Sequence, residues 1–265
     1  MEIEEEHTIN TQKCPIHYWL SGQEDKPFLI FSHGALMDHR MFNLQIEEVK
    51  KYFRVLAWDI RGHGKSQPMG KKFSIKLVVE DLMGILDTLG YEKAIFVGHS
   101  LGGIISQEIV FAYPERVRAL VSIGAPCTTL KISKAEKIKL FLLKLFMPLS
   151  PYKLLLKLIP ITLTINKEFH PYFIEVTNII SKETFIEIWK EILISNHYEP
   201  DYRITHPLLL THGDKDLRIV VSHAKKWSER DPNCKYVIIP NARHNSNQDN
   251  ASFFNKLLLN FLFKL

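Results

Sequence analysis

The stretch that most constrains this chain is the decapeptide Ala-Ile-Phe-Val-Gly-His-Ser-Leu-Gly-Gly at residues 94–103. A short β-branched and aromatic run leads into a Gly-x-Ser-x-Gly pattern, and a helix-compatible segment follows at once. This order predicts a strand, a tight turn and a helix. A serine at such a turn, here Ser100, has a strained backbone and a hydroxyl that projects above the sheet, and glycines flank it because strand and helix nearly touch. The alternative is an ordinary glycine-rich turn with Ser100 as a helix N-cap.

Apolar strands and helices alternate along the first half of the chain. Continuous apolar runs at residues 27–32 and 54–58 predict strands that are buried on both faces. Helical spacing of apolar residues follows at residues 41–52 and again after Ser74, a candidate N-cap, up to the helix-ending Gly90. Such alternation predicts right-handed crossovers and a mainly parallel sheet that is doubly wound, with helices on both faces.

The alternation stops after a further strand at residues 117–123. From residue 127 to residue 205 only helical periodicity is found, interrupted by prolines. Strands and helices then resume, at residues 206–213, 220–229, 235–239 and 251–263. We therefore predict one α/β core in two parts, residues 1–126 and 206–265, with a helical cap inserted at residues 127–205.

The N-terminal region is predicted to pair at the edge of the sheet. Two short alternating runs within residues 8–20 indicate an antiparallel hairpin, with Cys14-Pro15 and Ser21-Gly22 as breakers. Residues 1–6 are acidic and have no apolar core, so no signal peptide is predicted. No window of roughly eighteen uncharged apolar residues occurs, which argues against stable membrane insertion.

The cysteines and the charge limit the possible partners and location. The chain has three scattered cysteines without metal-ligand spacing, Cys14, Cys127 and Cys234. Such cysteines are typical of free thiols in a reducing compartment, so we predict a cytoplasmic protein. The net charge of +5 is concentrated in residues 131–165, which hold seven lysines and a single acid, Glu136. Because the rest of the chain is nearly neutral, no nucleic-acid partner is predicted. The basic segment suits peripheral contact with an anionic membrane, and a solvated lysine face explains it equally well.

Candidate catalytic residues follow three separate predicted strands. Ser100 lies at the Gly-x-Ser-x-Gly turn. Asp214 and Asp216 follow the predicted strand at residues 206–213, and His244 follows the predicted strand at residues 235–239. Ligands bind at the carboxyl ends of the strands in an open parallel sheet, so these side chains are expected to share one edge. A serine becomes a good nucleophile when a base removes its proton, which is a task for a histidine held by a carboxylate.

With these residues in view, the chain resembles the α/β-hydrolase family over nearly all of its length outside the inserted segment. Residues 98–102 resemble the family's nucleophile elbow, and residues 33–35, His-Gly-Ala, resemble its oxyanion loop. Residues 59–66 resemble a loop that is common in capped members. Residues 212–216, His-Gly-Asp-Lys-Asp, resemble the acid loop, in which the second aspartate is usually the catalytic one.

The resemblance implies a capped serine hydrolase with Ser100, Asp216 and His244 as catalytic residues. His244 would take the proton of the serine hydroxyl, and Asp216 would hold the imidazole in the required tautomer. The backbone N–H groups of Leu101 and Ala35 would form the oxyanion hole. This chemistry requires no metal and no organic cofactor.

Other assignments of these motifs remain open. Asp214 is an alternative to Asp216 as the acid. Asp59 and Arg61 are expected to form an ion pair that fixes their loop rather than to act in catalysis. Dehalogenases and epoxide hydrolases of this fold carry aspartate at the position of Ser100, which speaks against both activities. Four further histidines in the motifs are expected to be structural: His33, His63, His99 and His212.

We therefore predict a hydrolase of the carboxylesterase, lipase or lactonase type, acting on a small to medium, fairly lipophilic ester or lactone through an acyl-enzyme. Leucine and phenylalanine at helical spacing in the inserted segment favour an apolar acyl pocket over ordinary packing, and Leu36, Phe141 and Leu145 are expected to contact the substrate. A carbon–carbon bond hydrolase, a perhydrolase or a ligand-sensing regulatory protein could use the same residues. The chain is expected to be a monomer or a homodimer.

Overall fold

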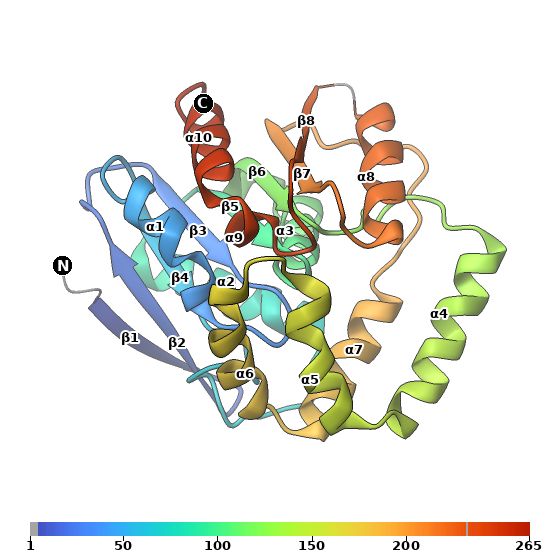
Figure 1. Ribbon diagram of the computed structural model, residues 1–265. Coiled ribbons are helices and arrows are strands. Elements are labelled where there is room, and N and C mark those ends of the chain that lie inside the picture. Colours follow the sequence, from blue (N-terminus) through green and yellow to red (C-terminus); the bar gives the residue numbers. More distant parts are fainter. Residues whose placement is uncertain (1–4, 232) are drawn as a thin grey trace.

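The computed structural model describes residues 5–231 and 233–265 and contains one sheet in which helices cover both faces (Figure 1). The eight strands are β1 (Glu5–Thr11), β2 (Cys14–Ser21), β3 (Phe28–Ser32), β4 (Arg54–Trp58), β5 (Ala94–His99), β6 (Val117–Ile123), β7 (Leu208–Gly213) and β8 (Cys234–Ile239). Their order in the sheet is β1-β2-β4-β3-β5-β6-β7-β8. Strand β2 is antiparallel to β1 and β4, and all pairs from β4 to β8 are parallel. The predicted α/β fold with a mainly parallel sheet is confirmed.

The predicted N-terminal hairpin is formed by β1 and β2, but its turn lies elsewhere than expected. Gln12 and Lys13 make the turn with φ values of 46° and 67°, the conformation of a two-residue turn that favours Asn and Gly. Cys14 and Pro15, predicted as breakers, are instead the first residues of β2 and pair with β1. Proline is tolerated at the start of a strand. Only Gly22, with φ 79°, ends the strand as predicted.

Ten α-helices connect and cover the strands in the described part of the chain. They are α1 (Asn43–Val49), α2 (Ile75–Leu89), α3 (Leu101–Ala112), α4 (Lys134–Phe146), α5 (Tyr152–Leu163), α6 (His170–Asn178), α7 (Lys182–Ile194), α8 (Arg218–Arg230), α9 (Ser246–Asp249) and α10 (Ala251–Leu262). The predicted ends of α2 are confirmed. The Ser74 hydroxyl accepts a hydrogen bond from the Leu77 N–H at 3.2 Å, and Gly90 stops the helix in the left-handed conformation.

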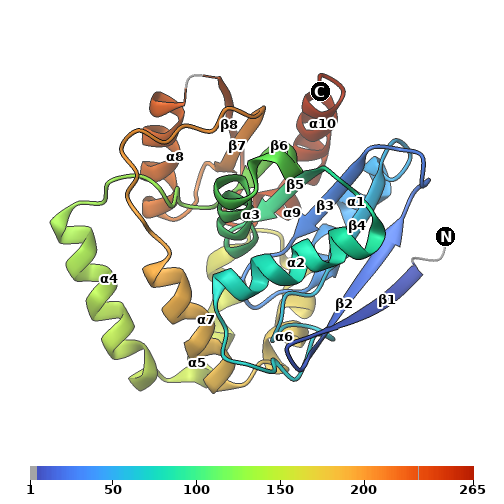
Figure 2. The ribbon, with the colours of Figure 1, turned by 180° about the vertical axis from the view of Figure 1, so that it is seen from behind.

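Two apolar layers hold the helices against the sheet. Successive strand residues alternate between the layers, so that in β4 Leu56 and Trp58 pack on one face and Val55 and Ala57 on the other. Helices α2, α3 and α8 cover the first face, and α1 and α10 cover the second (Figures 1 and 2). Such double coverage explains why the central strands are continuously apolar.

The segment at residues 127–205 contains no strand, as predicted, and its helices α4 to α7 lie between β6 and β7 in the chain. The division of the chain into a core and a cap domain remains a prediction. None of the helices in residues 5–231 and 233–265 is both long and apolar enough to cross a membrane. Residues 1–4, part of the acidic N-terminal stretch, lie outside the described residues.

Candidate active site

Ser100 occupies the sharp turn between β5 and α3. Its backbone angles, φ 50° and ψ −109°, are sparsely populated, and the Ser100 N–H donates a hydrogen bond to the Ile123 carbonyl at 2.8 Å. A Cβ atom at Gly98 would overlap the Gly102 carbonyl oxygen, and one at Gly102 would overlap the carbonyl oxygen of Ser32. The predicted turn is confirmed, and it positions the serine because only glycine fits on either side.

Alanine at Gly102 is expected to lower the free energy of unfolding by about 1–3 kcal/mol or more, because backbone must move to admit the Cβ. Gly84, in the middle of α2, is the matched control, since no atom beyond its chain neighbours and the adjacent backbone of its own helix lies within 4 Å of its ideal Cβ position. Gly84→Ala is expected to raise the free energy of unfolding by about 0.5–1 kcal/mol. Urea unfolding of both variants measures the difference. A Gly102→Ala protein as stable as the wild type would contradict this account of the turn.

Asp216 and His244 meet through a direct hydrogen bond. Asp216 follows β7 and His244 follows β8, and the His244 Nδ1–H donates to Asp216 Oδ1 at 2.7 Å. The Asp216 side chain is fully buried, and its Oδ1 also accepts the Leu217 N–H at 2.6 Å. With Nδ1 protonated in this way, the other ring nitrogen, Nε2, is left as a proton acceptor.

Asp214, the alternative acid, has a different environment. It lies on the surface and accepts a hydrogen bond from the Ala242 N–H at 2.9 Å. This bond holds the pKa of the Asp214 carboxyl below its usual value. Asp214 therefore fastens the loop that precedes His244, while Asp216 contacts the imidazole. The geometry favours Asp216 over Asp214 as the partner of His244.

The predicted oxyanion donors, Ala35 and Leu101, come from two loops that touch. The Gly102 N–H donates to the His33 carbonyl at 3.0 Å, which brings the 33–36 loop against the start of α3. Leu101 is the first residue of α3, where an N–H has no acceptor within the helix. Among the described residues, no protein group accepts a hydrogen bond from the N–H of Ala35 or Leu101. Both groups are therefore available to a ligand.

A cavity of about 590 Å³ lies between this edge of the sheet and the inserted helices. Ser100 and His244 both line it, and so does Leu36. Most of its surface is apolar. No hydrogen bond joins the Ser100 hydroxyl to the His244 ring in the described chain. Such bonds are often long in ligand-free enzymes and shorten when substrate binds.

Phe141 and Leu145, which the sequence predicts to contact the substrate, are not among the residues that line the cavity. Both side chains point to solvent from α4, with 64% and 55% of their surface exposed. The opposite face of the helix, with Lys139, Leu140 and Leu143, lines the cavity instead. Because α4 has apolar residues on both faces, its periodicity does not reveal which face turns inward.

Other cavity residues had no sequence signal of their own. Trp189 and Ile192 reach the cavity from α7, and Ile219 and His223 reach it from the first turns of α8. Helix α8 begins two residues after Asp216, so its start is necessarily close to the edge of the sheet where Asp216 lies. The contribution of α7 depends on how the inserted helices fold back, which spacing along the chain does not specify.

Asp59 and Arg61 fix their loops, as predicted, but not by pairing with each other. Arg61 is fully buried and forms a bidentate ion pair with Asp81 of α2, at 2.6 Å for each bond. Asp59 accepts hydrogen bonds from the His39 ring and the Lys65 N–H, each at 2.7 Å. The predicted Asp59–Arg61 pair is therefore wrong, because each residue has a partner from another segment.

The described residues contain one group of side chains that could hold a metal ion, formed by Asp38, His39 and Asp59. Asp38 is already bound by the Arg40 guanidinium, with its closest contact at 2.7 Å, and Asp59 by His39. None of the three lines the cavity with Ser100. These protein contacts account for the group without a metal.

The predicted structural histidines are buried and hydrogen-bonded. His33 donates to the Gly34 carbonyl at 2.8 Å and accepts the Ile60 N–H at 2.9 Å. His99 donates to the His244 carbonyl at 3.0 Å, so it supports the loop that carries His244. Burial lowers the pKa of His33 to about 3, that of His63 to about 4, and that of His99 well below 6.5.

The stability of the protein is expected to fall as the pH drops from 7 to 5. The unfolded chain binds protons at His33, His63 and His99 below about pH 6.5, while the folded protein keeps these three neutral down to lower pH, so protons favour unfolding. Each histidine contributes at most about 1.4 kcal/mol per pH unit, a slope that is reached well below pH 6.5, where its unfolded form is fully protonated. Urea unfolding at several pH values measures the slope. The slope measures how many protons bind on unfolding, and His63→Gln is expected to lower that number by about one. A slope unchanged by this substitution would contradict the lowered pKa of His63.

Curated relatives align with less than half of this chain. Epoxide hydrolase 4 of Mus musculus is 37% identical over 112 residues, which cover 42% of this chain and 31% of the relative. 3-Oxoadipate enol-lactonase 2 of Acinetobacter baylyi is 31% identical over 129 residues, covering 49% of this chain and 47% of the relative. The aligned parts thus span less than half of the length of either relative.

Solved structures share the complete fold. The enol-lactonase from Burkholderia xenovorans LB400 superposes with a TM-score of 0.83 over 97% of this chain and 100% of its own, at 21% identity. Such identity supports the fold alone. The family pattern described as "Serine aminopeptidase, S33" matches residues 23–250, which include every motif residue discussed above. The chain therefore belongs to this S33 family of α/β hydrolases.

Proposed function

We propose that this protein is a serine hydrolase that cleaves a small to medium, fairly lipophilic carboxylic ester or lactone through an acyl-enzyme. The observation that carries the proposal is the Asp216–His244 hydrogen bond, at 2.7 Å, beside a largely apolar cavity that Ser100 also lines. A serine, an imidazole and a buried carboxylate at one edge of a sheet match the requirements of nucleophilic acyl transfer.

In the proposed mechanism, Ser100 Oγ attacks the substrate carbonyl while His244 Nε2 takes the hydroxyl proton. Asp216 stabilises the imidazolium that forms. The N–H groups of Ala35 and Leu101 donate to the developing oxyanion, a contribution typically worth about a hundredfold to a thousandfold in rate per donor. His244 then protonates the leaving alcohol and activates the water that releases the acyl group from Ser100.

The cavity supports a lipophilic substrate. Its walls include Leu36 from the oxyanion loop and Leu140, Leu143 and Trp189 from the inserted helices. Transfer of an acyl chain from water to such walls is favourable by about 0.8 kcal/mol per buried methylene. The enol-lactonase among the relatives is consistent with lactone hydrolysis, and a linear ester satisfies the same geometry.

Two other hydrolytic reactions fit the site less well. Opening of an epoxide by Ser100 would form an ether, which the His244-activated water could not cleave, so the enzyme would not turn over. An aminopeptidase needs acceptors for the substrate ammonium group, but Glu136 is the only acid among the described residues that line the cavity. Its carboxylate already accepts the Ser133 N–H at 2.7 Å.

Substrate profiling tests the proposal. Purified protein is assayed with p-nitrophenyl esters of graded acyl length, with styrene oxide and with an amino-acid p-nitroanilide. Steady turnover of the esters, and covalent labelling of Ser100 by a fluorophosphonate, are the expected results. Turnover of the epoxide or the anilide without ester hydrolysis would overturn the proposal. A single slow turnover, with a large thermal shift on ligand binding, would instead favour the ligand-sensing alternative.

A further inference from the structure

Helix α4 is apolar on a face that no other part of the described chain covers. Seven of its thirteen residues are isoleucine, leucine or phenylalanine, yet none of its residues is buried. A helix that is hydrophobic on all sides normally lies in a protein core or in a lipid environment. Figures 1 and 2 show α4 along the outer margin of the molecule, away from the sheet. Its outer face therefore requires a partner.

Five exposed side chains, which we call the α4 patch, define this surface: Ile138, Phe141, Leu145, Leu149 and Leu154. Their exposed fractions run from 51% at Leu154 to 77% at Leu149. Ile138, Phe141 and Leu145 are spaced by three and four residues along one side of α4, whereas Leu149 lies in the short helical turn that follows and Leu154 in α5. Single exposed apolar residues are common on proteins, whereas a continuous stripe of them indicates a binding surface.

The charge around the α4 patch is strongly positive. Lys134 and Lys137 flank the stripe on α4, since each residue turns the helix by about 100°. Lys153 and Lys157 follow on α5. None of these four lysines makes an ion pair with a described residue, and Glu136 is the only acid in residues 131–165. A partner with negative charge would therefore complement this surface.

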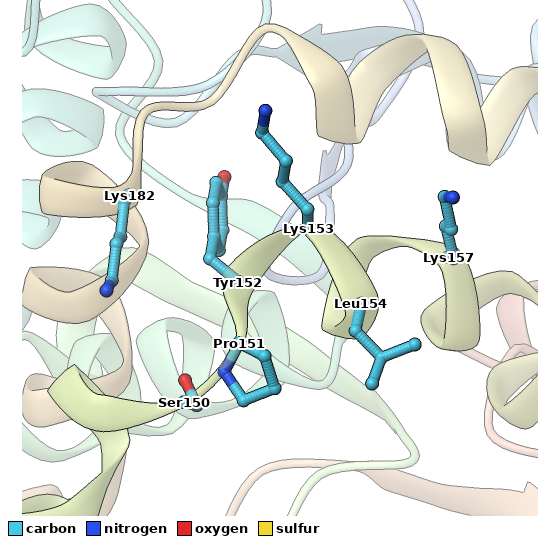
Figure 3. A pocket seen from close by; sticks show the side chains of 7 residues that line it. All are labelled: Ser150, Pro151, Tyr152, Lys153, Leu154, Lys157 and Lys182. Atoms are coloured by element: carbon cyan, nitrogen blue, oxygen red, sulfur yellow. The ribbon is translucent and has the colours of Figure 1, made fainter.

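A hollow of about 610 Å³ continues the basic surface at the start of α5 (Figure 3). Lys153, Lys157 and Lys182 line it together with Leu154 of the patch, and no acidic residue does. Figure 3 shows that Lys153 and Lys157 extend from one side of α5, whereas the exposed Leu154 extends from the other side. Basic and apolar side chains thus lie on different sides of α5, as in amphipathic helices that lie in a lipid interface.

We propose that the α4 patch docks on an anionic lipid surface, with its apolar side chains in the interface and the flanking lysines against the headgroups. A second copy of this chain fits less well, because two such faces would bring lysines together without an acid to pair with them. Lys139, Leu140 and Leu143, on the opposite side of α4, line the cavity with Ser100. Docking would therefore place that cavity about one helix diameter, roughly 10 Å, from the lipid.

Vesicle sedimentation tests the proposal without reference to catalysis. The full chain is mixed with phosphatidylcholine vesicles that either lack or contain phosphatidylserine, at low and high salt. We expect binding only to the anionic vesicles and less binding at high salt. Phe141→Ser combined with Lys137→Glu is expected to reduce the partition coefficient by more than about tenfold. The matched control is Phe253→Ser combined with Lys256→Glu on α10, which is expected to bind as the wild type does.

Urea unfolding establishes that both double variants are folded before vesicle binding is compared. Three results would overturn the proposal: no binding of the wild type to anionic vesicles, equal binding to neutral vesicles, or equal loss in the α10 control. Light scattering after size-exclusion chromatography examines the alternative occupant. A dimer that the α4 double variant dissociates would assign the patch to a second copy instead.

Discussion

Ser100→Ala is expected to lower kcat for a p-nitrophenyl ester by about 10⁴- to 10⁶-fold. The reason is that the variant has no atom to form the covalent acyl intermediate, although the oxyanion donors and the cavity remain. The residual rate should come from those groups acting on a water molecule. Alanine lacks only the Oγ of serine, so the cavity that Ser100 lines should keep its shape.

The control for this experiment is Ser252→Ala, which removes an exposed serine hydroxyl on α10. Its kcat is expected to equal that of the wild type. The fluorophosphonate adduct should be detected by mass spectrometry in the wild type and in Ser252→Ala, and be absent from Ser100→Ala. Turnover of Ser100→Ala at the wild-type rate, with the adduct on another residue, would remove Ser100 from the mechanism.

Asp216→Asn is expected to lower kcat by about 10⁴-fold. The amide can present its N–H₂ to His244 Nδ1, which would then become an acceptor and leave the proton on Nε2. In that tautomer the imidazole cannot take the proton of Ser100. Because asparagine has nearly the shape of aspartate and fits the same buried side-chain position, the fold should be preserved. Far-UV circular dichroism and urea unfolding establish that point.

Asp214→Asn is the matched control, since it makes the same chemical change two residues away. Its Oδ1 can still accept the Ala242 N–H, so kcat is expected to change by less than about tenfold. A large loss in Asp214→Asn with a small loss in Asp216→Asn would reverse the assignment of the acid. Equal large losses would show that the loop, rather than the contact with His244, controls activity.

Local sequence signals were sufficient to predict most of the strands and helix ends of the core. The continuous apolar runs predicted β3, β4, β5 and β6, and Ser74 and Gly90 predicted both ends of α2. These features are readable because a strand covered on both faces and a helix with an N-cap and a glycine stop have distinct patterns. The turn of the N-terminal hairpin was not predictable, because Gln12 and Lys13 adopt positive φ without the usual Asn or Gly.

At the site, too, some contacts were predictable from the sequence and others were not. The sequence order of Ser100, Asp216 and His244 predicted their common edge, and the hydrogen bond between Asp216 and His244 agrees with that expectation. Ion pairs between residues that are far apart in the sequence were not predictable. Arg61 pairs with Asp81 rather than with its neighbour in the motif, a choice that depends on how α2 packs against the loop.

The sequence by itself determined the order of strands and helices, the strained serine turn and the residues that follow each strand, because each depends on neighbours along the chain. Only the tertiary structure decided which side of α4 faces the cavity. Both sides are apolar, so the free energy of burying either is similar, and the choice follows from the packing of α4 against α7. That choice places Leu140 and Leu143 in the cavity and leaves Phe141 and Leu145 exposed.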